Sequence, residues 1–151
     1  MMKLRIEYPK HKEEREILDR MSSLDIPTPD SVISLEEILE VQRTVQEVYV
    51  DDRIKEYILQ IVFATREPKE YGLDLAGLIQ YGASPRASIF LLQAARAHAF
   101  IRGRGFVTPE DIKAIGPDVL RHRILLTYEA EAEEVTSDGI IQQIFDAVEV
   151  P

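Results

Sequence analysis

The chain has 151 residues, a formal net charge of −9, no cysteine and a hydrophobic fraction of 45%. Its length favours one domain, or one domain with short appendages, and its apolar content is enough for a hydrophobic core. No apolar run approaches the roughly 20 residues of a membrane span, and the N-terminal residues lack a signal-peptide pattern. We therefore expect a cytoplasmic protein without disulfides and without a membrane span. A nucleic-acid partner is not expected either, because the chain is acidic and its basic residues are few and mostly scattered.

The first elements predicted along the chain are a strand and a helix. Residues 3–9 alternate polar and apolar side chains and stop at Pro9, which predicts a short strand. A strand cannot be stable alone, so it is expected to be an orphan from a larger sheet. A helix follows, with apolar residues at helical spacing, and ends at the Pro27–Asp30 segment. Its apolar positions are Ile17, Leu18, Met21 and Leu24.

Two further helices are predicted between Ser34 and Thr65. Ser34 and Glu37 have capping-box spacing before an apolar stripe. Asp51 or Asp52 caps the next helix. The expected buried face of that helix comprises Ile54, Tyr57, Ile58, Ile61 and Val62.

Residues 67–83 contain one proline and three glycines and predict a long connection, with a short helix near Leu75 to Ile79. The longest helix is expected from Ser84 to about Arg102, stopped by Gly103 and Gly105. Its expected buried stripe comprises Ala87, Leu91, Ala94, Ala95, His98 and Ile101, widened by Ile89 and Leu92.

Thr108 and Pro109 begin another helix, with acidic residues in its first turn. It is expected to end near Gly116-Pro117, before a short helix from Val119 to Ile124. Residues 125–135 fit helix or extended chain equally well. Thr136 to Asp138 open a final helix. The predicted fold class is all-α, a helical bundle with one short orphan N-terminal strand.

The segment Gly82-Ala83-Ser84-Pro85-Arg86-Ala87-Ser88 carries the strongest candidate site. Ser84 is placed to cap the longest helix, and Pro85 fits its first turn. Arg86 then adds a positive charge at a helix end where cations are disfavoured, which an anion would compensate. A guanidinium also suits bidentate contact with phosphate oxygens. The alternative is that Arg86 pairs with a carboxylate of this acidic chain.

This motif stands in a series of segments whose order and spacing resemble the lid of MoxR-family AAA+ ATPases. The resemblance runs from about Leu35 to Phe145. The segments that carry it are Val50-Asp51-Asp52, Tyr57-Ile58, Ala64 to Pro68, Gly82 to Ser88, Ala95-Arg96-Ala97, Gly103-Arg104, Val107 to Ile112 and Val119 to Ile124.

The resemblance implies a division of the chain into three parts. Residues 1–9 correspond to a remnant of the last core strand, and residues 10–33 to a linker helix and loop. Residues 34–151 then form the AAA+ lid.

The resemblance further implies that Arg86 is the sensor-2 residue, which reaches phosphates of ATP bound with Mg²⁺ by the upstream core domain. Ser84 and Pro85 share this cofactor-binding motif. Proteins of this kind resemble chaperones that assemble rings, expected to be hexameric, and remodel or mature protein complexes. They often work beside von Willebrand factor A-domain partners.

The chain departs from a complete ATPase in three respects. It contains no Gly-x-x-x-x-Gly-Lys-[Ser/Thr] phosphate loop and no strand ending in Asp-Glu to hold magnesium. The arginine finger would lie upstream of Lys3. We therefore expect that these 151 residues alone do not hydrolyse ATP, although the parent protein does.

Other basic residues have two interpretations each. The Arg121-His122-Arg123 group could contact a neighbouring subunit or the core domain, or be favoured simply by a helix C-terminus. Arg66 could be interfacial, or solvated or paired with a carboxylate. His98 is expected to be a hydrogen-bonded core residue, and no metal site is expected because the histidines are dispersed.

A different class of function is also open. The chain could be a free-standing helical module that binds a protein and has no nucleotide role. The orphan strand favours the lid interpretation, because an independent module has no reason to begin within a sheet.

Overall fold

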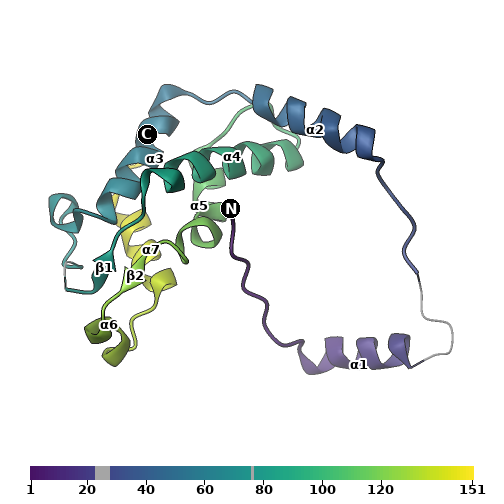
Figure 1. The fold of residues 1–151 in the computed structure, drawn as a ribbon, viewed down its shortest axis with the longest axis horizontal. Coiled ribbons are helices and arrows are strands. Elements are labelled where there is room, and N and C mark those ends of the chain that lie inside the picture. The colour runs from purple at the N-terminus through teal and green to yellow at the C-terminus, as the bar shows by residue number, and fades with distance from the viewer. Residues whose placement is uncertain (23–27, 76) are drawn as a thin grey trace.

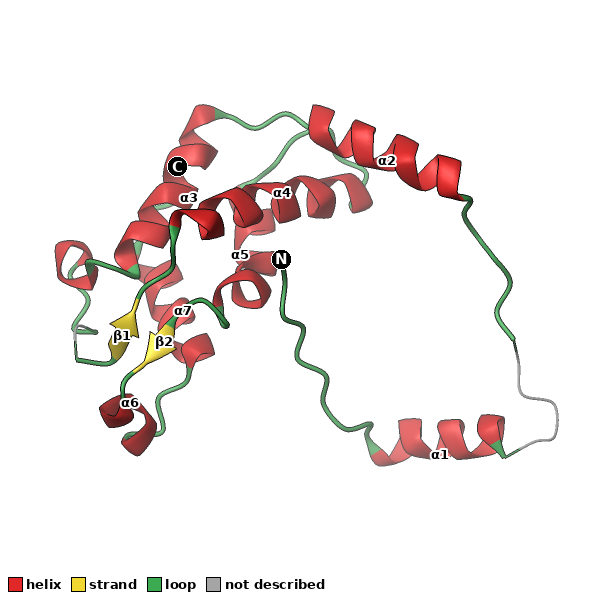
Figure 2. Cartoon of the chain, viewed as in Figure 1, coloured by secondary structure: helices red, strands yellow, loops and turns green. Residues whose placement is uncertain are grey.

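A computed structural model describes residues 1–22, 28–75 and 77–151 of the chain. The predicted all-α class is confirmed, since the described part is mostly helical with one small sheet (Figures 1 and 2). The elements are α1 (His11–Met21), α2 (Leu35–Glu47), α3 (Asp52–Ala64), the 3-10 helix η1 (Pro68–Tyr71), β1 (Ile79–Tyr81), α4 (Pro85–Ile101), α5 (Pro109–Leu120), β2 (Leu125–Leu126), α6 (Tyr128–Ala132) and α7 (Ser137–Ala147).

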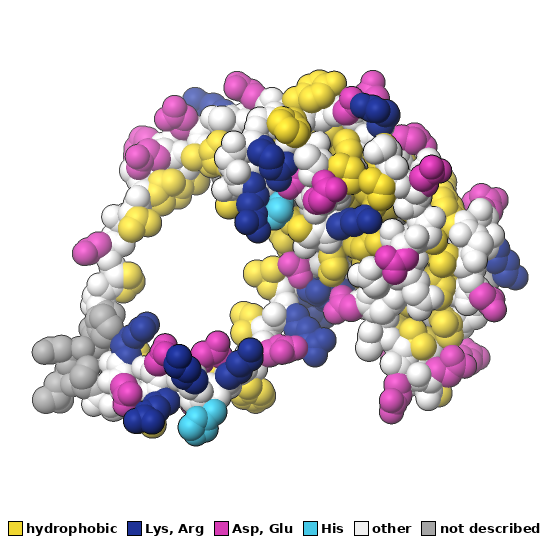
Figure 3. Space-filling view, turned by 180° about the vertical axis from the view of Figure 1, so that it is seen from behind, with side chains coloured by type: hydrophobic (Ala, Val, Ile, Leu, Met, Phe, Trp, Pro, Cys, Tyr) yellow, Lys and Arg dark blue, Asp and Glu magenta, His cyan; other side chains and the backbone are white. Residues whose placement is uncertain are grey.

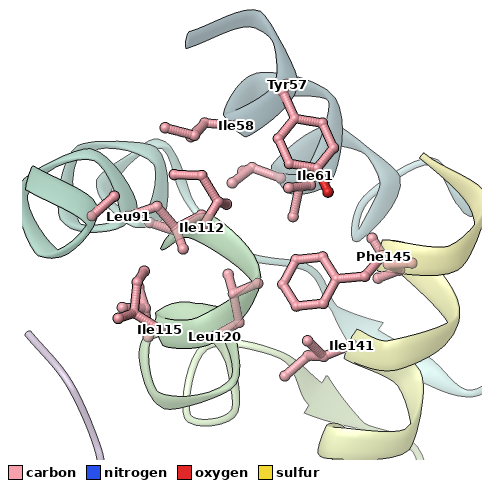
Figure 4. Close-up of a cluster of buried hydrophobic side chains, with 14 of the residues drawn as sticks. Tyr57, Ile58, Ile61, Leu91, Ile112, Ile115, Leu120, Ile141 and Phe145 are labelled. Carbon is pink, nitrogen blue, oxygen red and sulfur yellow. The ribbon is translucent and has the colours of Figure 1, made fainter. Parts of the chain in front are cut away.

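The core lies between α3, α4, α5 and α7, which pack as a compact body (Figures 1 and 4). Tyr57 and Ile61 of α3 face Ile112 of α5 in the close-up, and Phe145 reaches the same cluster from α7. The α3 face expected to be buried is confirmed at all five positions. Burial of such apolar surface is the main source of stability.

The N-terminal part has a different character. Residues 1–10 form an extended arm without a strand partner, and α1 stands away from the compact body (Figure 1). Charged side chains of both signs lie along α1, and none of its residues is buried (Figure 3). The arm contacts the body near α5, where the Lys3 N–H donates to the Asp118 carbonyl at 2.7 Å. Leu24 and Pro27, expected near the end of this helix, lie outside the described residues.

Local capping explains where most helices begin. Ser34 and Glu37 form the expected capping box, and Asp51 accepts the Arg53 N–H at 2.9 Å. Thr108 and Asp111 form a second box at the start of α5. Each of these side chains satisfies an N–H group that has no partner within its helix.

The helix α4 confirms the longest predicted helix, but its buried stripe differs in part. Ala87, Leu91 and Ala95 are fully buried, whereas Ile101 is 79% exposed and Ile89 is 55% exposed. Ile89 is rotated by about 160° from Leu91 around the helix and therefore lies on the opposite face. Ile101 lies in the last turn, at the edge of the stripe.

The small sheet was not predicted. Strands β1 and β2 pair antiparallel, with Ile79 opposite Leu126 and Tyr81 opposite Leu125. The helix expected near Leu75 to Ile79 is instead a turn that leads into β1; Ala76 within it lies outside the described residues. Residues 125–135, left open between helix and extended chain, contain both, because β2 is followed at once by α6. Pairing between distant segments decided this region.

The helix α5 continues through Gly116-Pro117, where an end was expected. Pro117 removes its own N–H, and the turn after it is held in the core by Val119 and Leu120, which are fully buried. A Cβ at Gly116 would lie 2.3 Å from Cζ of Phe145, so glycine here permits close contact with α7. The expected separate helix from Val119 to Ile124 is thus the last turn of α5 and the turn after it.

Candidate functional site

The loop before α4 is held by the end of α3. The hydroxyl of Thr65 accepts the Ala83 N–H at 2.8 Å and donates to the Val62 carbonyl at 2.6 Å. Nε of Arg66 donates to the Ala83 carbonyl at 2.6 Å. Both polar groups of the buried Ala83 backbone are therefore paired, as a buried peptide group requires. The position where α4 begins is thereby fixed to α3.

Gly82 allows this contact. A Cβ at this position would lie 2.4 Å from the Thr65 carbonyl oxygen, a distance that real Cβ atoms do not reach. The loop can therefore approach α3 closely only with glycine here. The Gly82-Ala83-Ser84 part of the motif thus has a structural function that sequence reasoning missed.

The first turn of α4 presents Arg86 to the outside. Ser84 occupies the N-cap position, but its hydroxyl makes no capping hydrogen bond, which corrects the expected cap. Pro85 is the first helical residue, and Arg86 is exposed. Within the described residues, no carboxylate pairs with the Arg86 side chain and no group accepts a hydrogen bond from it. An uncompensated guanidinium at the N-terminus of a helix is suited to an anion.

Arg123 lies beside Arg86. Phe90 is one turn along α4 from Arg86, and the Arg123 guanidinium carbon lies 5.0 Å from the centre of its ring. Nη1 of Arg123 also donates to the Val119 carbonyl. Burial lowers the pKa of Arg123, and the positive charge of Arg86 lowers it further. Arg86 and Arg123 therefore place two positive charges near the first two turns of α4.

His122 lies directly next to Arg123. Nε2 of His122 lies 2.5 Å from Nη1 of Arg123. Burial lowers the pKa of His122, and the neighbouring charge of Arg123 acts in the same direction. The imidazole is therefore favoured in the neutral form, which can accept a hydrogen bond from Arg123.

Arg121 has different surroundings. Its Nε donates to Asp138 at 3.0 Å, and its Nη1 donates to Asp118 and to the Lys3 carbonyl, the latter at 2.6 Å. Arg121 thereby joins the end of α5 to the start of α7 and to the N-terminal arm. Its charge is balanced by two carboxylates, so the three residues of the 121–123 group do not share one environment.

Arg66 differs from Arg121, because it makes no ion pair with a carboxylate in the described structure and its partners are a backbone carbonyl and an aromatic ring. Besides its bond to Ala83, its guanidinium carbon lies 5.1 Å from the centre of the Phe63 ring. The structure therefore links Arg66 to the start of α4. It supports the loop that carries the Ser84-Pro85-Arg86 motif.

A second polar group was only partly visible in the sequence. Asp111 is fully buried and accepts from Nδ1 of His98 at 2.6 Å, from both Nη atoms of Arg104 and from the Thr108 N–H. Burial alone would raise the pKa of Asp111, but the hydrogen bonds from Arg104, Thr108 and His98 together hold it far below its ordinary value. The group joins α4 to α5 and confirms His98 as hydrogen bonded.

No three side chains of the metal-binding types gather in the described part of the chain. No helix in those residues is long and apolar enough to cross a membrane.

Known proteins resemble this chain over its whole length. Residues 75–144 match the family model of the AAA lid domain. The chain is 38% identical to the chaperone MoxR1 of Mycobacterium tuberculosis, covering 100% of this chain and 40% of that protein. It is 34% identical to the protein MoxR of Methylorubrum extorquens, covering 80% of this chain and 37% of the relative.

A solved structure agrees with these relatives. A crystal structure from Cytophaga hutchinsonii, assigned as an ATPase by inference, is 40% identical and superimposes with a TM-score of 0.95, over 100% of this chain and 46% of that one. The chain thus spans less than half the length of the relatives it matches. The family match includes α4 with Arg86 and the turn with Arg123. The chain is the lid region of a MoxR-family AAA+ ATPase.

Proposed function

We propose that this lid responds to nucleotide, and that Arg86 is its sensor-2 arginine. In this role Arg86 contacts phosphate oxygens of ATP that is bound, with Mg²⁺, mainly by a preceding core domain. A positive charge placed there stabilises negative charge on the phosphoryl group during hydrolysis. It also couples the state of the nucleotide to the orientation of the lid. This chain supplies the arginine and its support, and the core domain supplies the remaining groups.

One observation carries this proposal: the guanidinium of Arg86 is exposed and has no carboxylate partner in the described structure, although the chain is strongly acidic. Thr65 and Arg66 hold the loop before it, so the helix start is fixed while the side chain stays available. A fixed backbone reduces the entropic cost of binding an anion. Ser84 and Pro85 contribute the uncapped helix start on which Arg86 is mounted.

The division of the chain follows from the same proposal. Residues 1–9 belong to the last strand of the core, residues 10–33 link core and lid, and residues 34–151 are the lid. The apolar stripe of α1 supports this division, because Ile17, Leu18 and Met21 are all at least half exposed. We propose that the core domain covers this stripe.

The proposed parent protein assembles as a ring, expected to be a hexamer, and remodels or assembles protein complexes. One relative is named a chaperone, which supports this class of activity. Von Willebrand factor A-domain proteins are proposed partners by analogy with the family. A cytoplasmic location remains a prediction.

The proposal is tested by ATP hydrolysis in the full-length ATPase that contains this lid. Arg86→Ala should lower turnover by about tenfold or more, because a phosphate-contacting arginine is lost. Arg102→Ala is the matched control, since Arg102 is an exposed arginine at the other end of the same helix. If both variants keep normal turnover and a normal response to ATP, Arg86 is not the sensor-2 residue and the lid proposal loses its main support.

A further inference from the structure

We propose that Arg123 is a second phosphate-binding arginine, which shares the nucleotide phosphates with Arg86. This inference rests on the proposed function and extends it to a residue outside the Ser84-Pro85-Arg86 motif. It also separates the roles within the 121–123 group, because Arg123 binds the ligand while Arg121 holds the fold.

The first argument is the position of Arg123. Arg86 and Phe90 are four residues apart on α4, and therefore lie on one face of the helix. The guanidinium of Arg123 rests on the Phe90 ring, with 5.0 Å between its carbon and the ring centre. This contact brings a residue that follows α5 to the part of α4 that carries Arg86. An anion bound by Arg86 on this face is therefore close to Arg123.

The second argument is the set of donors that Arg123 leaves free. Its contacts to the Val119 carbonyl and to His122 all use Nη1. Its Nε and Nη2 atoms donate to no group within the described residues. An arginine held in this way is anchored on one side, and its remaining N–H groups can bind phosphate oxygens.

The third argument is the balance of charge. Arg104 and Arg121 also lie near helix ends of this bundle, and each is paired with at least one aspartate. Arg86 and Arg123 have no carboxylate partner in the described structure, and their positive charges repel each other. Two like charges held together cost free energy, which an anion between them would offset. A phosphate group has the charge and the acceptor oxygens for this purpose.

The test measures ATP and ADP affinity of the full-length ATPase by titration calorimetry. Arg123→Gln removes the charge but keeps a polar side chain that can still donate to Val119. It should weaken ATP binding by about threefold to tenfold and ADP binding by less, as expected for loss of a charge-assisted bond at a partly exposed site. Arg123→Lys should recover part of the ATP affinity because the charge is restored, and Arg102→Ala should behave as wild type.

A purely structural role for Arg123 gives a different result. In that case Arg123→Gln and Arg123→Lys lower the melting temperature but change ATP and ADP affinity equally, which overturns the inference. The inference is also overturned if Arg123→Gln affects only ring assembly, measured by sedimentation, while each assembled ring binds ATP normally. If Arg123→Gln does not fold, Phe90→Leu decides, since loss of the ring that positions Arg123 should reduce the preference for ATP.

The variants also separate this inference from the proposed function. If Arg86→Ala impairs hydrolysis and Arg123→Gln leaves ATP affinity unchanged, the sensor-2 proposal stands and the shared site is rejected. If neither variant has an effect, both are rejected. In the double variant, the loss of ATP affinity should be smaller than the product of the two single losses, because both arginines contact the same phosphates.

Discussion

Nε of Arg66 donates a hydrogen bond to the carbonyl oxygen of Ala83, over 2.6 Å and across 17 positions of the sequence. The bond joins the residue after the C-cap of α3 to the residue before the N-cap of α4. The start of α4, and with it Arg86, is therefore positioned from α3. Changes on α3 are expected to alter the candidate nucleotide site without touching it.

Replacement of Thr65 by valine tests this connection. Valine has nearly the same shape but cannot accept the Ala83 N–H, which is buried. An unpaired buried N–H costs about 1–3 kcal/mol, so the free energy of unfolding should fall by that amount. Urea denaturation of the chain measures it. Thr65→Ser keeps the hydroxyl, so its free energy of unfolding should fall clearly less than that of Thr65→Val. Equal losses of unfolding free energy in the two variants would show that the hydrogen bond is unimportant.

Substitution of Gly82 by alanine should disturb the same contact by sterics. The new Cβ would meet the Thr65 carbonyl, a backbone atom that cannot swing aside as a side chain can. We expect a loss of about 1–3 kcal/mol in unfolding free energy, typical of overpacking. Gly105→Ala is the control, because a Cβ there meets nothing within 4 Å, and its stability should stay within about 0.5 kcal/mol of wild type.

Most of the helices could be predicted because their signals are local. Capping residues such as Ser34, Asp51 and Thr108 act within one turn, and the apolar spacing of α3 repeats every three or four residues. The location of Arg86 in the first turn of α4 also followed from its place after Ser84 and Pro85. These features depend on sequence neighbours alone.

Features that depend on distant residues could not be predicted in this way. The pairing of β1 with β2 joins Ile79 to Leu126, and no local pattern marks either strand. The continuation of α5 through Pro117 depends on packing against α7. The position of Arg123 beside Arg86 depends on the packing of the α5 end against α4, so the sequence offered only three basic residues with equal weight.

Packing at Gly116 gives a prediction with a rescue. Alanine in a helix is intrinsically favoured over glycine by about 1 kcal/mol, but here its Cβ would lie 2.3 Å from Cζ of Phe145. Phe145 is buried and cannot move freely. We expect Gly116→Ala to lower the melting temperature, since overpacking costs about 1–3 kcal/mol.

Phe145→Leu makes room for the new methyl group. Phe145→Leu should lower the free energy of unfolding less in the Gly116→Ala variant than in the wild-type protein. A double-mutant cycle of unfolding free energies measures the difference. Strict additivity of the two changes would show that Gly116 and Phe145 are not in steric contact.

The buried carboxylate of Asp111 should contribute strongly to the free energy of unfolding, because three other residues donate hydrogen bonds to it. Asp111→Asn leaves the Arg104 charge without its partner and weakens the bond from His98. Removal of one member of a buried ion pair is costly, and partial exposure of Arg104 reduces the loss to about 2–4 kcal/mol. Asp74→Asn, at an exposed position, should change the unfolding free energy by less than about 0.5 kcal/mol.

The effect of Asp111 should depend on pH in a defined direction. Its pKa in the folded protein is far below the ordinary value of 3.8, so the unfolded chain binds its proton first as the pH falls. The stabilisation is therefore fully present above about pH 5 and is lost progressively below pH 4. Urea denaturation at several pH values should show a constant difference between wild type and Asp111→Asn from pH 8 to pH 5, which narrows towards pH 3. A difference that stays constant down to pH 3 would mean that the pKa of Asp111 in the folded protein equals its ordinary value. Its hydrogen bonds to Arg104 and His98 would then not favour the ionised form.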